Sequence, residues 1–332
     1  TGIKSIFFLK YLLLYLVVRF LVEKKIINLK IFFITCALCS VFVSCDIIIQ
    51  FIFGKDIFGY GIVEGSRKLG GPFGNELIAG SYIQRFSLFA FFLLPIYFNN
   101  SKLNKLNKFF LSLLFMLFSI SLILAGNRMH LLLFLFIFCL IFIFQKEVRK
   151  FFLHFVIIFI LVFSLLINFN NVIKNNFKNF YFSISSIISI TLKDDNEVQA
   201  LSHLQEFNTF YDTWLMHKYI GGGIKNYRYF CHARPNADKN RQSVCNMHPH
   251  NYYLEILTET GLLGFLIILS VFGITLNKTF FKKYIFQTSL KNNKVIIPFL
   301  FLFIAEIFPI KSTGSFFTTG NTTYIFLILS IL

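Results

Sequence analysis

Long runs of apolar residues recur along the chain and are separated by short polar segments. A helix needs about 20 apolar residues to cross a bilayer core of roughly 30 Å. The runs are continuous, whereas the strands of a membrane barrel alternate apolar and polar residues, so the pattern predicts helices. The predicted membrane spans are residues 5–22, 31–53, 75–98, 109–126, 129–145, 151–169, 251–276, 295–310 and 317–332.

Composition supports this interpretation. Of 332 residues, 56% are hydrophobic and 14% are charged, and 48 are phenylalanine. A soluble domain averages about a quarter charged residues and cannot bury so many large apolar side chains, and a disordered chain is far more polar. We therefore expect an all-α polytopic membrane protein with a bundle of about nine transmembrane helices. Because the sequence begins at Thr1 and ends within an apolar run, we expect it to be truncated from a longer protein.

The basic residues predict an orientation for these spans. Four connections on one side hold 14 Lys and Arg, and the short connections on the other side hold 5. The positive-inside rule makes the first side cytoplasmic and places the N-terminus outside. The net charge of +17 is then mainly a topogenic signal, and its scatter over short loops argues against a nucleic-acid partner. The connections on the basic side are residues 23–30, 99–108, 146–150 and 277–294.

The spans divide the chain into three parts. Residues 1–169 hold the first six spans, residues 170–250 form one long hydrophilic loop outside the cytoplasm, and residues 251–332 hold the last three spans. Apolar positions at helical spacing predict two amphipathic helices in the loop, over 177–188 and 201–215. The first has the pattern of a helix lying flat on the membrane surface, and the second is expected to end at the glycines 221–223.

Cys231 and Cys245 both lie in this external loop, where nearby thiols commonly oxidise. A disulfide between them would close a ring of about 15 residues and contribute roughly 3 kcal/mol in the chain-entropy model. Two alternatives remain open: a pair of free thiols, and a zinc site that also uses His232, His248 and His250. Because the spacing matches no standard zinc pattern, we favour the disulfide and predict no metal site and no cofactor.

The segment 245–264, with the sequence CNMHPHNYYLEILTETGLLG, carries the strongest signal for chemistry. His250 precedes the seventh span, and Asn251, Glu255 and Glu259 follow at intervals of four, so these three share one helix face. Two carboxylates entering a membrane need a polar cavity or partners. A capped helix with an interfacial histidine is the alternative, but the convergence of His, Asn and two Glu favours a functional site.

Cations provide the complementary signal. Arg128 lies in the short turn Gly126-Asn127-Arg128 at the outer boundary of the membrane, and Arg85 lies about ten residues into its span. An arginine at that depth requires water or an anion. Residues 220–228, with the sequence IGGGIKNYR, place three glycines before Lys225 and Arg228. Such a segment can present backbone N–H groups and cations to a phosphate.

Together these residues indicate transfer from a lipid-linked diphosphate. Arginines would stabilise the charge that develops on the leaving diphosphate, and His250 would accept a proton from an incoming hydroxyl. This interpretation requires Arg128 and His250 to face a common cavity outside the cytoplasm. The alternative from another class is a transporter without chemistry, for which Arg85 is the best evidence, but the two halves show no matching repeats or broken helices.

Over about residues 70–280 the chain resembles the O-antigen ligase and polymerase superfamily of bacterial envelope proteins. The likeness rests on PHNYYLEILTETGLLGF after a long external loop, on the upstream GGG, and on GNR closing the fourth span. It implies a C-type glycosyltransferase-like fold of about twelve spans in the bacterial inner membrane, with a helical periplasmic subdomain. It also implies an undecaprenyl-diphosphate glycan donor, a lipid A core acceptor, and metal-independent transfer with inversion.

The resemblance assigns roles to individual residues. Arg128 matches the arginine that faces the donor diphosphate, and His250 matches the histidine that activates the acceptor. The family's second arginine is replaced here by His203 or by Arg228. The other predicted substrate-binding residues are Gly221, Gly223, Lys225, Arg85, Asn251, Glu255 and Glu259. We favour a ligase; a polymerase or a protein glycosyltransferase of the same superfamily would share this site.

Overall fold

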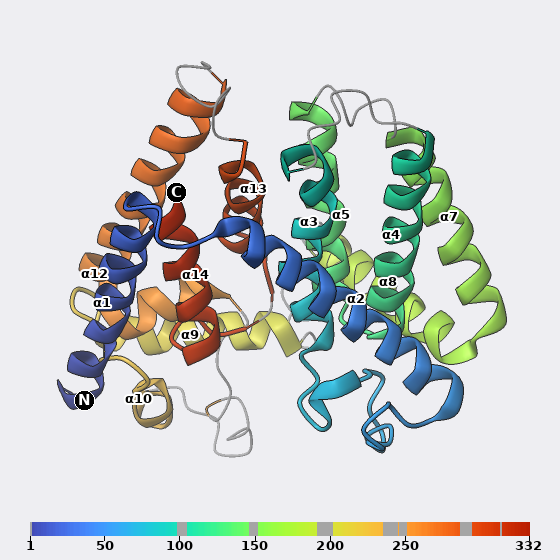
Figure 1. The fold of residues 1–332 in the computed structure, drawn as a ribbon. Coiled ribbons are helices and arrows are strands. Elements are labelled where there is room, and N and C mark those ends of the chain that lie inside the picture. Colours follow the sequence, from blue (N-terminus) through green and yellow to red (C-terminus); the bar gives the residue numbers. More distant parts are fainter. Residues whose placement is uncertain are drawn as a thin grey trace. The chain divides into compact units, whose positions relative to one another are not determined.

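The computed structural model describes residues 2–97, 105–145, 152–190, 202–234, 245, 251–285, 294–312 and 314–332. This part of the chain is all-helical, as predicted, and its one β pairing is an isolated antiparallel bridge between Lys55 and Gly61. The helices, drawn in Figure 1, are α1 (Gly2–Glu23), α2 (Leu29–Phe53), η1 (Gly71–Phe73), α3 (Ala79–Tyr97), α4 (Lys105–Leu124), α5 (Arg128–Phe144), α7 (Phe152–Phe169), α8 (Asn171–Ile190), α9 (Ser202–Met216), α10 (Tyr227–Ala233), α12 (Tyr252–Leu276), η4 (Asn277–Ile285), α13 (Ile296–Glu306) and α14 (Thr319–Ile331).

Each of the nine apolar segments contains a helix. Two of these, Leu29–Phe53 and Tyr252–Ile285, are long and apolar enough to cross a membrane, and the bent pair 153–169 and 171–182 counts as a third. The described residues also form four shorter apolar helices: Phe109–Leu124, Arg128–Phe144, Ile296–Glu306 and Thr319–Ile331. The number of nine spans therefore stays a prediction.

The chain folds into two compact units. The central unit comprises residues 28–185, and the terminal unit comprises residues 1–27 and 186–332. Most of α8 falls in the central unit, whereas α9 and α10 fall in the terminal unit. The predicted external loop thus contributes helices to both units.

In the central unit, α2 packs against α3 and α4 through a core rich in phenylalanine. The rings of Phe33 and Phe89 meet edge to face with centroids 4.9 Å apart, an arrangement that aromatic pairs prefer. Two buried polar residues of α2 hold the connection 54–78. Asp46 accepts a hydrogen bond from the Ile57 N–H (2.8 Å), and Gln50 accepts one from the Gly71 N–H (2.9 Å). Hydrogen bonds therefore attach the connection 54–78 to α2.

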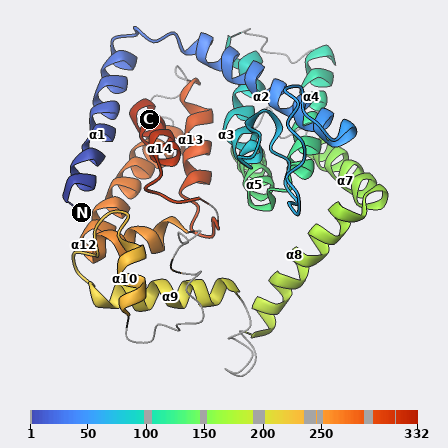
Figure 2. The same cartoon turned by 90° about the horizontal axis from the view of Figure 1, so that it is seen from below.

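A sharp bend separates α7 from α8. The two helices meet at 112°, and the break falls at Asn170, whose side chain accepts a hydrogen bond from the Ile173 N–H (3.0 Å) and so caps α8. Figure 2 shows α8 leaving the line of α7. The first predicted loop helix is present and is longer than its apolar pattern indicated. The cap starts the helix at Asn171, ahead of Phe177, where the apolar pattern begins.

In the terminal unit, α1 runs along α14, and α9 lies against the first half of α12. Phe8 of α1 contacts the ring of Phe317 (centroids 5.3 Å apart). Most side chains of α13 are buried in this unit. The first half of α12 therefore has neighbours from several distant parts of the sequence, and it positions much of the candidate site.

Candidate functional site

The turn Gly126-Asn127-Arg128 between α4 and α5 is fixed by close backbone packing. Gly126 has φ +68°, and a Cβ atom there would collide with the carbonyl group of Arg67. The Asn127 side-chain amide donates to the Leu77 carbonyl (3.3 Å). These contacts bring the connection 54–78 next to Arg128 and account for glycine at position 126.

The guanidinium of Arg128 is oriented by α8. Its Nε donates to Asn176 Oδ1 (2.9 Å), its Nη2 donates to the same oxygen, and its Cζ lies 5.4 Å from the centroid of the Phe180 ring. Asn176 is buried. An arginine has five N–H donors, and the described residues engage two of these in hydrogen bonds. The group is thus held in place while retaining donors for a ligand.

Two further cations lie beside Arg128. Burial lowers the pKa of Lys68, and the charges of Arg67 and then Arg128 lower it further. All three residues belong to the central unit. Like charges are costly to bring together unless an anion compensates them. Sequence reasoning missed Arg67 and Lys68; the available signal was a basic pair on the side of the membrane that the positive-inside rule depletes of such residues.

Arg85 lies half-buried in α3, directly after the buried side chain of Gln84. Its predicted contact with substrate stays a prediction.

Asn251 caps α12. Its Oδ1 accepts hydrogen bonds from the Tyr253 N–H (2.9 Å) and the Leu254 N–H (3.2 Å), and its Nδ2 donates to the Pro309 carbonyl (2.8 Å). The asparagine therefore starts the helix and ties it to the segment after α13. His250 lies outside the described residues, so its role and its predicted cavity with Arg128 stay predictions.

The two carboxylates of α12 are buried and hold neighbouring segments. Glu255 accepts hydrogen bonds from the Ser315 hydroxyl and the Phe316 N–H. Glu259 accepts one from the Lys225 N–H (2.7 Å). Both acids therefore have clear structural partners, which satisfies the requirement that a carboxylate inside a membrane protein be paired.

The glycine-rich segment crosses α12 at very short range. The N–H groups of Gly222 and Gly223 donate to the carbonyls of Thr258 (3.2 Å) and Glu259 (2.8 Å). In return, the N–H groups of Leu262 and Leu263 donate to the carbonyls of Lys218 (2.9 Å) and Tyr219 (3.1 Å). Gly221 and Gly261 both have positive φ, and a Cβ atom on either would collide with the backbone of the other.

This crossing corrects two details of the sequence interpretation. Helix α9 ends at Met216, before the glycines, because the carbonyls of residues 218 and 219 bond to α12 and cannot continue the helix. The N–H groups of Gly221 and Gly223 donate to His217 and Glu259 carbonyls, so they do not form the predicted phosphate cradle. The glycines instead permit the crossing that presents Lys225.

The remaining predicted cations lie in the terminal unit. The side chains of Lys225 and Arg228 are exposed, the latter on α10. His203 falls in α9, but its side chain is outside the described residues. The structure therefore does not choose between His203 and Arg228 as the second donor-site residue.

Cys231 and Cys245 form a disulfide in the structure, with Cα atoms 5.4 Å apart. It packs in a buried cluster with Phe210 and Tyr227, whose rings stack with centroids 3.8 Å apart. Arg234 Nη1 donates to the Cys231 carbonyl (3.0 Å). The bond joins α10 to the segment before α12. The alternative zinc site required both sulfurs as thiolates, which this pairing precludes.

A buried ion pair that sequence reasoning missed lies next to α12. Glu306 and Lys311 pair at 1% and 3% side-chain exposure. The Tyr252 hydroxyl donates to Glu306 Oε1 (2.6 Å) and accepts from Lys311 Nζ (2.9 Å). The available signal was Glu306 itself, the one acid in the predicted span 295–310.

The apolar helices and the charged side chains buried among them define a multi-pass membrane protein of all-helical fold. Residues 113–269 match the family model described as O-Antigen ligase. This confirms the resemblance read from the sequence: the matched segment, slightly less than half of the chain, is similar to the O-antigen ligase family. It includes Arg128, the glycine crossing, the disulfide and the first half of α12. The chain matches no curated protein sequence.

Proposed function

We propose that this protein is an O-antigen ligase. It transfers a glycan from an undecaprenyl-diphosphate carrier to a sugar hydroxyl of the lipid A core, on the periplasmic face of the bacterial inner membrane. The family match over residues 113–269 supports this reaction class. The proposal for the donor and the residues goes further and rests on the argument below.

The observation that carries the proposal is the cluster of Arg67, Lys68 and Arg128. Three cations lie close enough for two of them to lower the pKa of the third. Among the described residues none of the three has an ion-pair partner within 4.0 Å. A diphosphate supplies the opposite charge, and the planar guanidinium of Arg128 suits its oxygens. We therefore assign the donor diphosphate to this cluster.

The proposed reaction is a single displacement. The acceptor hydroxyl gives its proton to the imidazole of His250 and attacks C1 of the donor sugar. The bond from C1 to the diphosphate oxygen breaks, and the carrier diphosphate leaves with the electron pair. Attack from the face opposite the leaving group inverts the configuration at C1. Arg128, Lys68 and Arg67 stabilise the charge that grows on the diphosphate.

The test measures glycan transfer by the purified protein from a labelled lipid-diphosphate glycan, the donor, to lipid A core, the acceptor. We expect His250→Ala to lose at least 100-fold in kcat, since general base catalysis contributes typically 10²–10⁴-fold. The matched control is His154→Ala, a histidine exposed on α7, which should retain wild-type activity. Equal activity of the two variants would refute the role of His250.

A second pair of variants tests the donor site. Arg128→Lys keeps the charge but loses the bidentate hydrogen bonding of a planar guanidinium, so KM for the donor should rise at least tenfold. Arg19→Lys, on an exposed arginine of α1, is the control. Full activity of Arg128→Lys would refute diphosphate binding there.

A polymerase of the same superfamily is the second candidate, because the family match covers both activities. It would use a second lipid-linked glycan as acceptor. Supplying each acceptor separately distinguishes the two: transfer only to the lipid-linked glycan would refute the ligase and establish the polymerase.

A further inference from the structure

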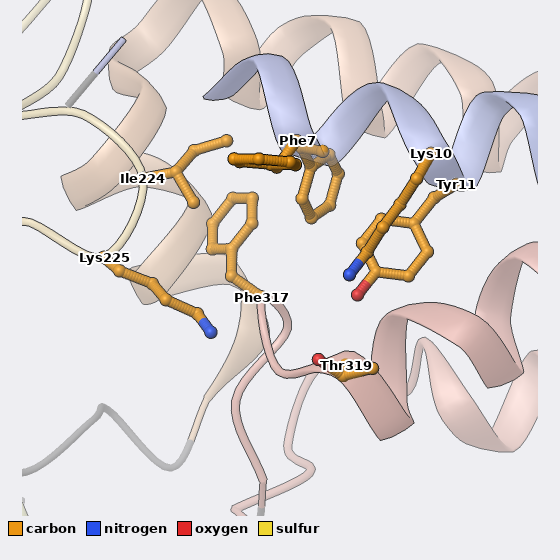
Figure 3. A pocket seen from close by; sticks show the side chains of 8 residues that line it. Phe7, Lys10, Tyr11, Ile224, Lys225, Phe317 and Thr319 are labelled. Carbon is orange, nitrogen blue, oxygen red and sulfur yellow. The ribbon is translucent and has the colours of Figure 1, made fainter. Parts of the chain in front are cut away.

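The terminal unit contains a small pocket that the proposed donor site at Arg67, Lys68 and Arg128 does not use; among its lining residues, only Lys225 was a predicted substrate contact. Its volume is about 210 Å³, and it lies where α1, the segment after Gly223 and the start of α14 meet. The lining residues are Phe7, Phe8, Lys10, Tyr11, Ile224, Lys225, Phe317 and Thr319. Figure 3 shows that Phe7, Ile224 and Phe317 gather on one side, while Lys10 and Lys225 approach from separate segments.

Lys225 is held at the pocket by unusual backbone geometry. Its φ is +58°, a conformation that residues other than glycine rarely adopt. The hydrogen bond from its N–H to Glu259 and the adjacent glycine crossing fix this conformation. Because strain of this kind persists where the surroundings enforce it, and gathers at ligand sites, the position of Lys225 indicates a binding role.

Lys10 is the second cation of the pocket. It lies near the middle of the first predicted span, where an ammonium group facing lipid would be costly. Its Nζ lies 4.9 Å from the centroid of the Tyr11 ring, a cation–π distance. Within the described part of the chain, neither Lys10 nor Lys225 has an ion-pair partner within 4.0 Å.

Among the described residues, the acids nearest to Lys225 contact other groups and form no ion pair with its ammonium group within 4.0 Å. The carboxylate of Glu259 accepts from the backbone of Lys225, not from its ammonium group. The two oxygens of Glu255 accept from Ser315 and Phe316, and the charge of Lys225 acts on this carboxylate from beyond ion-pair distance. Two ammonium groups therefore face a space whose remaining walls are mostly aromatic and aliphatic.

We propose that this pocket binds the phosphate group of a lipid, with Lys10 and Lys225 contacting the phosphate oxygens and the apolar walls contacting the first part of the chain. This volume is smaller than the roughly 300–1,000 Å³ of pockets that hold complete drug-sized ligands. The pocket therefore suits a phosphate and the atoms next to it better than a whole lipid-linked glycan. An isoprenoid phosphate and a glycerolipid phosphate share this chemistry.

The test is equilibrium binding of radiolabelled farnesyl phosphate to the purified full chain in nanodiscs of neutral lipid. We expect saturable binding that weakens at least tenfold in Lys10→Met and in Lys225→Gly. The glycine variant removes the side chain and relieves the positive-φ strain, so it should fold normally. Lys10→Arg should retain binding. The matched control is Lys24→Met, an exposed lysine beyond the end of α1.

Competitors define the ligand. Unlabelled farnesyl phosphate or dihexanoyl phosphatidic acid should displace the label, and the better of the two identifies the lipid class. Farnesol and inorganic phosphate should compete at least tenfold less well. The proposal is overturned if Lys10→Met binds like wild type, if farnesol competes as well as farnesyl phosphate, or if inorganic phosphate does.

This site does not depend on the proposed transfer reaction. Arg128 is not among the lining residues, so Arg128→Lys should bind farnesyl phosphate normally while losing transfer. Loss of binding in Lys10→Met with intact transfer would support the pocket alone. The lipid-phosphate pocket and the transfer reaction can therefore be refuted independently of each other.

Discussion

Gly261→Ala is expected to be among the most damaging single-methyl changes in this protein. Gly261 lies within α12 at φ +66° and ψ −171°, a region that is essentially restricted to glycine. An alanine Cβ there would collide with the backbone of Tyr219 and Gly221. Either α12 straightens and releases the glycine-rich segment, or the strained conformation persists.

Each outcome has its own cost. Holding alanine in this conformation costs about 1–3 kcal/mol, to which the collision with the backbone of Tyr219 and Gly221 adds. Releasing the segment instead breaks the four backbone hydrogen bonds that join residues 218–223 to α12, at about 0.5–1.5 kcal/mol each, or about 2–6 kcal/mol together. We therefore expect Gly261→Ala to lower the free energy of unfolding by at least about 2 kcal/mol, and to lower the affinity of the pocket at Lys225 for lipid phosphate.

Gly273→Ala is the matched control, because Gly273 lies in the same helix with nothing within 4 Å of its would-be Cβ. Alanine in a regular helix is favoured over glycine by roughly 0.5–1 kcal/mol, so this variant should be as stable as wild type or slightly more so. Thermal unfolding in detergent, followed by circular dichroism, measures both. Equal melting temperatures for the two variants would show that the close crossing does not exist.

Three other changes have defined outcomes. Lys311→Met should destabilise the protein by about 3–5 kcal/mol, because it leaves the buried Glu306 without its cation; adding Glu306→Gln should recover most of this loss in thermal unfolding. Reducing the Cys231–Cys245 disulfide should lower stability by about 3 kcal/mol for a ring of about 15 residues, measured by unfolding with and without reductant. Because burial, Arg67 and Arg128 lower the pKa of Lys68, this lysine loses its proton at a lower pH than an exposed lysine with a pKa of about 10.4. Binding of an anionic donor requires the protonated form, so KM for the donor should rise with pH below that value, and Lys68→Arg should move the rise to higher pH.

Each of these predictions has a contradicting result. A Lys311→Met variant as stable as wild type would show that the ion pair is not buried. Reductant without effect on the melting temperature would contradict a structural disulfide. A donor KM that stays constant up to the titration of ordinary lysines, in both wild type and Lys68→Arg, would remove Lys68 from the donor site.

Much of the fold was predictable because bilayer thickness and helical periodicity leave a direct trace in the sequence. Each apolar segment contains a helix, and both loop helices are present as α8 and α9. The bend at Asn170 and the early end of α9 were not predictable in this way. They depend on a side-chain cap and on carbonyls that bond to α12 about 44 residues later in the sequence, from Lys218 to Leu262.

The candidate site was predictable in residue type more than in role. Asn251, Glu255 and Glu259 were recognised as one helix face. Their partners, however, are distant in sequence: Pro309 and Ser315 lie about 60 residues from Asn251 and Glu255, and Lys225 lies 34 residues from Glu259. No local pattern identifies such partners. The disulfide differs, because its two cysteines are close in sequence and the external loop favours oxidation, so local reasoning suggested the pairing that the structure contains.

The distribution of charge links the fold to the proposed chemistry. The acids of α12 and α13 stabilise the fold. Glu255 and Glu259 accept hydrogen bonds from neighbouring backbone and hydroxyl groups, and Glu306 forms an ion pair with Lys311. In the described part of the chain, Arg128 and Lys225 form no ion pair within 4.0 Å, and Lys225 interacts with Glu255 only at longer range. Buried carboxylates that bond to neighbouring groups of the protein, together with cations such as Arg128 and Lys225 that form no close ion pair among the described residues, suit the protein to anionic ligands such as donor diphosphates and lipid phosphates. The charge-preserving variants Arg128→Lys and Lys10→Arg therefore separate the effect of charge from that of geometry at the two proposed sites.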